Sequence, residues 1–252
     1  MPKQVRGAVI ADEGWKLVVA DASQLEPRVL AGMAGDRGMA EAGADDLYAG
    51  IVASGAVETR DQAKVAMLGA MYGATTGESG RLMPKLARAY PKAIGLVEKA
   101  ARAGELGEIV TTTLGRSSPE PSARWRATQA DAYGENATSA QVDRARGEAR
   151  SWGRFTRNFV VQGSAAEWAL CWMASLRKRL HELSGETWLT DAPHLVFFLH
   201  DEVVVHAPAM LADRVAEEVR AAAVDAGRLL FGEMPIAFPV TVAIVDNYGE
   251  AK

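Results

Sequence analysis

Acidic residues follow two apolar stretches of the chain that are typical of buried β-strands. Asp201 and Glu202 come directly after LVFFLH at 195–200, and Asp21 ends the run KLVVAD at 16–21. Carboxylates at the edge of a core bind cations or hydrogen-bond donors, because an unpaired buried charge is costly. The alternative is ordinary turn chemistry or helix capping, which commonly uses Asp at such positions.

Two cations and an aromatic residue share one face of a predicted helix. Arg60, Lys64, Leu68 and Tyr72 follow one another at intervals of four residues, so they drift around one broad face. Such a face suits phosphate groups together with a stacked base. The alternative is a solvated basic edge beside a stripe of core residues.

A second polar stripe runs along a long helical segment in the C-terminal half. Five of its members are spaced four residues apart: Arg146, Arg150, Arg154, Asn158 and Gln162. Arg157, beside Asn158, continues the row. A solvated amphipathic helix with internal ion pairs is the alternative to a phosphate-binding stripe. The two amides enter a segment rich in aromatic and aliphatic residues, where amides need hydrogen-bond partners.

Hydrophobic periodicity and Gly/Pro signals predict the elements that carry these residues. We expect strands at 16–21 and 238–249, a hairpin at 194–208, and helices from Pro27 and over 44–55, 60–72, 83–105 (broken at Pro91), 142–180 and 211–231. A short β-rich segment is predicted at 108–115. The Ser- and Pro-rich stretch 116–141 predicts a long surface loop.

Composition restricts the class of protein. The chain has 252 residues, 48% of them hydrophobic and 24% charged, with a net charge of -4 and one cysteine, Cys171. These values are typical of a globular protein without disulfides, and they predict a reducing, cytoplasmic location. The N-terminus resembles no signal peptide, and no apolar run approaches the roughly 20 residues of a membrane span.

Four segments in order resemble motifs of family A DNA polymerases, the DNA polymerase I group. They are DASQLEPRVLA at 21–31 with Gly35-Asp36, the helix Arg60 to Gly73, the segment Asn158 to Ala166, and His200-Asp201-Glu202. The resemblance extends from about Val5 to Tyr248. It is strongest to the actinobacterial-type proteins described as bifunctional 3′–5′ exonuclease/DNA polymerases.

This resemblance implies template-directed DNA synthesis, in which a dNTP is added to a primer 3′-OH with two Mg²⁺ ions roughly 3.5–4 Å apart. Asp21 and Asp201 would bind the ions, with the carbonyl of Ala22 as a further ligand and Glu202 as an auxiliary acid. Lys64 would donate a proton to pyrophosphate.

The resemblance also implies two sets of binding residues. Those for the nucleotide are Gln24, Glu26, Tyr48, Arg60, Lys64, Leu68 and Tyr72. Those for primer–template DNA are Arg116, Arg154, Asn158, Gln162 and His200. Glu26 would crowd the 2′ position of the sugar. Leu68 and Tyr48 depart from the family, which usually has an aromatic residue and a histidine there.

The implied fold class is α+β, with an antiparallel palm sheet and a helical fingers insertion, and without thumb or exonuclease domains. The palm would comprise 1–40 and 151–252, and the fingers 41–150. The expected partners are primer–template DNA and dNTPs, with no membrane. The alternatives are a catalytically impaired polymerase fragment and a non-catalytic DNA-binding module that retains the motifs. Retention of both Asp21 and Asp201 argues against the module, because clustered acids do not favour contact with phosphates.

Overall fold

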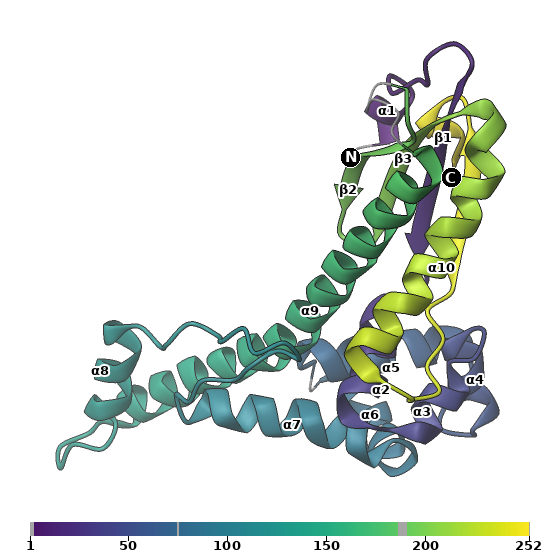
Figure 1. Ribbon diagram of the computed structural model, residues 1–252. Coiled ribbons are helices and arrows are strands. Elements are labelled where there is room, and N and C mark those ends of the chain that lie inside the picture. The colour runs from purple at the N-terminus through teal and green to yellow at the C-terminus, as the bar shows by residue number, and fades with distance from the viewer. Residues whose placement is uncertain (1–2, 75, 186–190, 252) are drawn as a thin grey trace. The chain divides into compact units, whose positions relative to one another are not determined.

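The computed structural model describes residues 3–74, 76–185 and 191–251, which divide into two compact units. The sheet unit is drawn from Met1–Leu25, Ala166–Glu233 and Ala237–Lys252, and the helical unit from Glu26–Ala165 and Met234–Ile236. The long helix α9, Ser139–Ser184, contributes its first part to the helical unit and its second part to the sheet unit (Figure 1). The predicted palm and fingers boundaries stay predictions.

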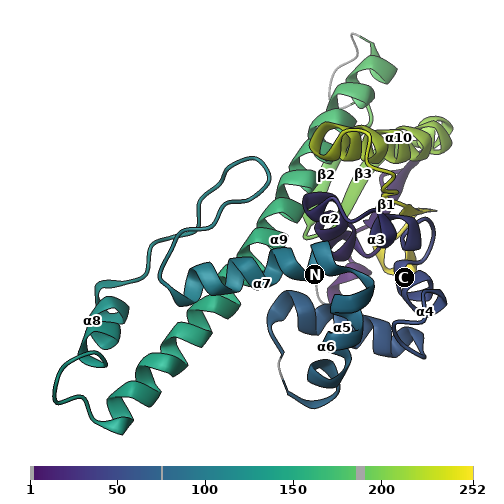
Figure 2. The same ribbon diagram turned by 90° about the horizontal axis from the view of Figure 1, so that it is seen from below.

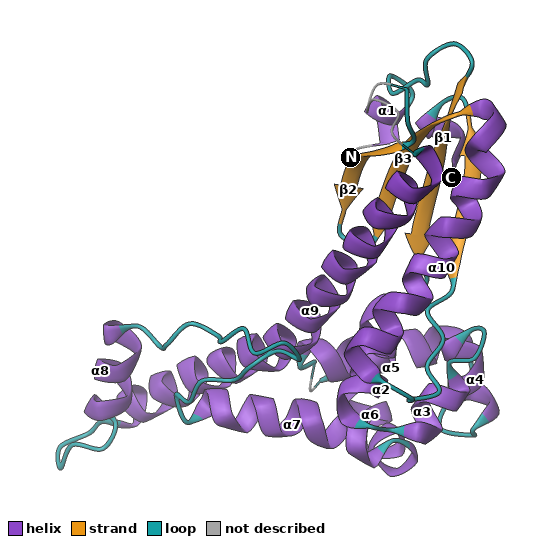
Figure 3. Cartoon of the chain, in the orientation of Figure 1, coloured by secondary structure: helices purple, strands orange, loops and turns teal. Residues whose placement is uncertain are grey.

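The sheet unit contains a four-stranded antiparallel sheet in the order β2-β3-β1-β4 (Figure 3). Its strands are β1 Trp15–Ala22, β2 His194–Leu199, β3 Glu202–Pro208 and β4 Val240–Val245. β2 and β3 form a hairpin, and β1 pairs with β3 from Trp15↔Pro208 to Asp21↔Glu202. The predicted strands and the hairpin are therefore confirmed, and with them the α+β fold class.

Both faces of the central strand β1 are covered. Leu17, Val18, Val19 and Ala20 are all buried, so the strand lacks the alternation of a sheet with one wet face. Helix α10, Ala212–Phe231, packs along β1, β3 and β4, as Figure 1 shows. Leu17 and Val19 pack instead with Tyr248, which begins the short helix η2, Tyr248–Ala251; η2 contacts α1, Lys3–Arg6. A further short helix, η1, Ala209–Leu211, precedes α10.

Two tryptophans join the second part of α9 to α10 and the chain beyond it. The indole Nε1 of Trp172 donates a hydrogen bond to the carbonyl of Val219 in α10, at 3.0 Å. The ring of Trp168 stacks on Phe238, with centroids 4.9 Å apart. Both tryptophans are fully buried, so they are major contributors to the hydrophobic stabilisation of this unit.

The helical unit is built from short helices with polar caps. They are α2 Leu25–Ala34, α3 Arg37–Ala42, α4 Leu47–Ala53, α5 Arg60–Tyr72, α6 Gly77–Ala89, α7 Pro91–Glu105 and α8 Ala123–Asp131. The side chains of Asp36, Asp46, Thr59 and Ser122 each accept a backbone N–H of the helix that follows. Pro91 begins α7, as predicted, because a proline in the first turn costs no hydrogen bond.

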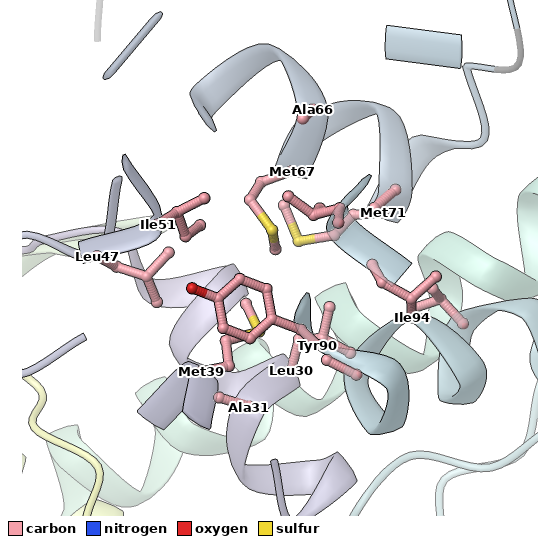
Figure 4. Packing of buried hydrophobic residues seen from close by; sticks show 14 of the residues in the cluster. Leu30, Ala31, Met39, Leu47, Ile51, Ala66, Met67, Met71, Tyr90 and Ile94 are labelled. Atoms are coloured by element: carbon pink, nitrogen blue, oxygen red, sulfur yellow. The ribbon is translucent and has the colours of Figure 1, made fainter. Parts of the chain in front are cut away.

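The core of this unit is formed mainly by aliphatic residues and methionines (Figure 4). Met67 and Met71 of α5 meet Leu30 of α2, Leu47 of α4 and Tyr90 at this core. α5 therefore buries one face, and the opposite face remains for other contacts.

Two predictions about the stretch 108–141 were wrong. The predicted surface loop contains α8, which Ser122 caps, and this helix buries none of its residues, so it has no apolar period for a sequence to reveal. The predicted β-rich segment forms only an isolated bridge between Thr111 and Ser117. Tertiary packing against α9 replaces strand pairing there.

The first part of α9 packs closely on α7, as Figure 2 shows. The hydroxyl of Thr156 donates to the carbonyl of Ala100 at 2.8 Å, and a Cβ placed on Gly104 would lie 2.0 Å from that hydroxyl. The two helices can approach this closely only because residue 104 is glycine. None of the helices in the described ranges has the length and apolarity needed to span a membrane.

Candidate active site

Main-chain pairing brings Asp21 and Asp201 to the same end of the sheet. Asp21 lies opposite Glu202 at the end of β1, and the N–H of Ala22 donates to the carbonyl of Asp201 at 2.9 Å. His200 and Asp201 form the two-residue loop of the hairpin, and His200 has a φ of 62°. The two aspartates are therefore positioned by backbone hydrogen bonds, and each side chain remains half-exposed.

Glu202 differs from its two acidic neighbours because its side chain is buried. The hydroxyl of Tyr248 donates to its carboxylate, and Arg6 lies 3.9 Å from the same oxygen and over the Tyr248 ring. Glu202 thus holds η2 and α1 against the sheet. This structural role was not predicted from the sequence, and a further role as an auxiliary acid stays a prediction.

The donor set at this end of the sheet fits magnesium. Carboxylate and carbonyl oxygens are the hard ligands that Mg²⁺ prefers, and Asp21, Asp201 and the carbonyl of Ala22 would supply them. Within the described ranges, no three His, Cys, Asp or Glu side chains gather as a metal site. The fit therefore rests on two carboxylates, and Glu202 is engaged elsewhere.

The predicted row of residues on α5 lies on its exposed face. Arg60, Lys64, Leu68 and Tyr72 all face solvent, whereas the opposite face contributes to the core. Leu68, which a core stripe would bury, is 37% exposed. α5 thus presents two cations, an aliphatic residue and a tyrosine in order along one surface.

Three predicted residues from distant segments meet at the C-terminal end of α5. The Tyr72 hydroxyl donates to the Glu26 carboxylate, at 3.0 Å from Oε2 and 3.2 Å from Oε1. Gln162 Nε2 donates to the Tyr72 hydroxyl at 2.9 Å and to Glu26 Oε1 at 3.4 Å. Burial, and then the Glu26 carboxylate, raise the pKa of Tyr72, so its hydroxyl keeps its proton. This cluster fixes the Glu26 carboxylate in one orientation.

Some side chains of the polar stripe on α9 point to solvent and others point inward. Arg154 is exposed and lies across Gly73, where an added Cβ would lie 2.7 Å from its Cγ. Asn158 acts with Gln162 to lower the pKa of Tyr72, against the larger raising effects. Arg157 points inward, with Nη1 2.9 Å from the carbonyl of Ala70 and Nη2 2.6 Å from Glu98.

Arg116 is held in a turn that packs on the same helix. Its main chain closes the turn with Thr112, and the N–H of Thr113 donates to the Ser164 hydroxyl at 2.9 Å. A Cβ on Gly163 would lie 2.4 Å from the Thr112 methyl group, so this close approach requires glycine. Arg116 and Gln162 therefore belong to one neighbourhood of the helical unit.

The remaining predicted residues occupy different surroundings. Gln24 lies in the turn after β1 with a φ of 55°, which is uncommon outside glycine. His200 is exposed, with Nδ1 3.6 Å from Asp201 Oδ1. Tyr48 is largely buried, and burial raises the pKa of its hydroxyl.

Sequence reasoning missed Asp46 and the buried Arg28. Asp46 accepts a hydrogen bond from Arg60 Nε at 2.8 Å, and Arg28 donates to the carbonyls of Gly43 and Asp45. An Asp before the apolar run LYAGIVA is a signal for a helix cap. Its contact with a residue fourteen positions later had no such signal.

Comparison with known proteins gives consistent results. The family model described as DNA polymerase family A matches residues 1–250. DNA polymerase I of Thermus thermophilus is 28% identical over 263 residues, covering 96% of this chain and 28% of that protein. The Thermus aquaticus protein is 28% identical over 273 residues, covering 99% and 29%. The chain therefore spans less than a third of these relatives.

A solved structure shares the fold. The POL domain of Pol1 from M. smegmatis, in complex with DNA primer-template and dNTP, superposes with a TM-score of 0.71 at 19% identity. The match covers 99% of this chain and 43% of that one. At this identity the likeness establishes the architecture alone.

Proposed function

Because the chain belongs to DNA polymerase family A, we propose that it catalyses template-directed DNA synthesis from dNTPs. The observation that carries this proposal is the family match together with Asp21 and Asp201 at one end of adjacent strands. The chain spans less than a third of its Thermus relatives, so activity, substrates and partners are all part of the proposal.

In the proposed reaction, the primer 3′-oxygen attacks the α-phosphorus of the dNTP, and the bond to the bridging oxygen of pyrophosphate breaks. Asp21, Asp201 and the Ala22 carbonyl would hold two Mg²⁺ ions. When bound, such ions lower the pKa of a hydroxyl nucleophile and neutralise charge on phosphate oxygens. Asp21 and Asp201 are suited to this role because the strands fix their backbones.

The exposed face of α5 would bind the nucleotide. Arg60 and Lys64 are cations one turn apart, a spacing that suits neighbouring phosphates. Lys64 would also donate a proton to the leaving pyrophosphate. Leu68 would lie against the base, and Glu26, held by Tyr72 and Gln162, would crowd the 2′ position of the sugar.

Polar residues, some exposed and some half-buried, would contact primer and template. Arg154 and Arg116 lie on the helical unit, and Asn158 and Gln162 lie on α9 close to Tyr72. His200 lies beside Asp201 in the sheet unit. In this proposal the sheet unit corresponds to the palm and the helical unit to the fingers.

Primer extension with Mg²⁺ tests the proposal, with binding of the same labelled primer–template measured in parallel. We expect dNTP-dependent extension at low salt that weakens at physiological salt, since phosphate contacts release counterions. Binding without extension would indicate a DNA-binding module. Absence of both would contradict the polymerase assignment for this chain.

A further inference from the structure

One cation on the exposed face of α5 has an anchored side chain. Arg60 donates from Nε to Asp46 Oδ2 at 2.8 Å, and its guanidinium carbon lies 5.4 Å from the centre of the Tyr48 ring. The contact is partly open to solvent, with 53% of the Arg60 side chain and 38% of the Asp46 side chain exposed. The carboxylate and the ring together define one direction for the guanidinium.

Asp46 is itself oriented by helix α4. Its Oδ1 accepts hydrogen bonds from the N–H groups of Tyr48, at 2.9 Å, and Ala49, at 3.1 Å. The two carboxylate oxygens of Asp46 therefore have different partners, since Oδ1 caps α4 and Oδ2 accepts the hydrogen bond from Arg60. The cap orients the plane of the carboxylate independently of its contact with Arg60.

The buried side chain of Arg28 holds the main chain of the segment that leads to Asp46. This arginine is 1% exposed and donates to the carbonyls of Gly43 and Asp45. Burial lowers the pKa of Arg28, and the nearby carboxylates of Asp46 and Asp45 oppose that shift. A buried arginine with these bonds gives the capping residue a rigid support.

Arg60 contacts Asp46 through Nε, so the edge of the guanidinium formed by Nη1 and Nη2 can bind a ligand. Among the residues that the structure describes, none accepts a hydrogen bond from Arg60 Nη1 or Nη2. These two nitrogens form the planar fork that binds a phosphate at two points. The contact with Asp46 thus anchors Arg60 without occupying the groups that phosphate requires.

We propose that Asp46 is a positioning residue that orients Arg60 for the triphosphate of the incoming nucleotide. The inference rests on the proposed function, because it takes the α5 surface as the triphosphate site. Asp46 also carries a negative charge that repels phosphate. Positioning outweighs this repulsion, because an unanchored arginine loses rotamer freedom on binding, whereas exposed charges are screened.

The expected effect is modest because the pair is partly exposed. Exposed ion pairs contribute little to binding, so loss of this one should weaken triphosphate binding by no more than about fivefold. Asp46→Asn is the sharpest variant, since an amide oxygen still caps α4 while the charge is removed. Asp46→Ser, another capping residue, serves as the second variant should Asp46→Asn be poorly folded.

Titration calorimetry with Mg²⁺–dNTP, and separately with inorganic tripolyphosphate, tests the proposal on the full chain. Asp61→Asn is the matched control, because Asp61 stands next to Arg60 and makes no hydrogen bond to it. We expect Asp46→Asn to weaken binding of both probes and Asp61→Asn not to. In primer extension, Asp46→Asn should raise KM and leave kcat nearly unchanged.

A double-mutant cycle separates positioning from general structure. In the Arg60→Ala background, Asp46→Asn should have no further effect on tripolyphosphate binding. An equal loss in both backgrounds, or binding by Asp46→Asn that equals or exceeds wild type, would overturn the proposal. If the wild-type protein binds tripolyphosphate but does not extend a primer, the proposed polymerase function is contradicted and the inference about Asp46 is not. If the wild-type protein binds neither Mg²⁺–dNTP nor tripolyphosphate, the inference is overturned.

Discussion

The two units position their chemically important residues by different means. In the sheet unit, main-chain pairing sets Asp21 opposite Glu202 and bonds Ala22 to Asp201. In the helical unit, side chains are held by other side chains, as in the cluster of Glu26, Tyr72 and Gln162. We therefore expect that Asp21 and Asp201 can be replaced without loss of the fold, whereas replacements in the helical unit alter their neighbours as well.

The largest expected effect is the loss of nucleotide addition in Asp201→Ala. Charge stabilisation by bound metal is worth several kcal/mol, so addition should fall by about a thousandfold or more. The fold should persist, because Asp201 contributes its main-chain carbonyl to the pairing with Ala22. Primer extension and circular dichroism measure the two expectations.

A matched acid provides the control for this substitution. Asp191 is exposed and precedes β2 at the end away from His200, so Asp191→Ala should leave extension unchanged. Wild-type extension by Asp201→Ala would refute its assignment to the metals. Loss of the circular dichroism spectrum would show that side chains hold the sheet unit as well.

The next largest effect is on stability, in Arg157→Ala. This buried arginine bonds the carbonyl of Ala70 and the carboxylate of Glu98, and hydrogen bonds to charged groups contribute about 1.5–3 kcal/mol. We expect the free energy of unfolding to fall by about 2–3 kcal/mol in denaturant titrations. Arg150→Ala, at an exposed position of the same helix, should change it by less than about 0.5 kcal/mol. Unchanged stability with weaker DNA binding would return Arg157 to the DNA-facing stripe.

The contrast between the units explains what the sequence could predict. Apolar runs that end in Asp21 and in His200-Asp201 predicted the strands and the hairpin, because strands and hairpins follow local patterns. The spacing of Arg60, Lys64, Leu68 and Tyr72 predicted a shared face of α5 for the same reason. Local periodicity in the sequence therefore predicts both the strands with their hairpin and the shared face of α5. The meeting of the two aspartates was implied by the family resemblance alone.

Contacts between distant side chains could not be predicted in this way. Arg157 continues the polar stripe at the position before Asn158, yet it points inward to Ala70. Asp46 has the signal of a helix cap, but its bond to Arg60 depends on how two helices pack. α8 escaped prediction because it buries no residue and so has no apolar period. Tertiary packing determines the contacts of Arg157 and Asp46, whereas α8 is marked in the sequence only by its cap, Ser122.

Sugar selection should respond strongly to Glu26 and more weakly to its partner Tyr72. Glu26→Ala removes bulk expected at the 2′ position, and a few atoms in a tight pocket are worth about 1–3 kcal/mol. The ratio of rNTP to dNTP incorporation should therefore rise at least about tenfold. Tyr72→Phe removes only the hydroxyl that orients Glu26, and we expect a smaller rise in the same direction.

Competitive incorporation assays measure both ratios. Glu78→Ala removes an exposed acid in the first turn of α6 and should leave selectivity unchanged. Unaltered selectivity in Glu26→Ala would show that this carboxylate does not face the sugar. An effect of Glu26→Ala without one of Tyr72→Phe would mean that Glu26 keeps its orientation without the tyrosine hydroxyl.

The smallest effect concerns Leu68, where the family usually has an aromatic residue. Leu68→Phe should lower the KM for dNTPs, because base–aromatic stacking is worth about 1–3 kcal/mol and the lower end suits an exposed position. That lower end corresponds to about a fivefold change. The position is 37% exposed on the face of α5 opposite the core, so the larger ring should leave the free energy of unfolding nearly unchanged.

Leu68→Met, which is similar in size and not aromatic, separates stacking from bulk and should leave KM near the wild-type value. An unchanged or higher KM in Leu68→Phe would mean that this face of α5 does not meet the base, and the nucleotide-binding assignment would then rest on Arg60 and Lys64 alone.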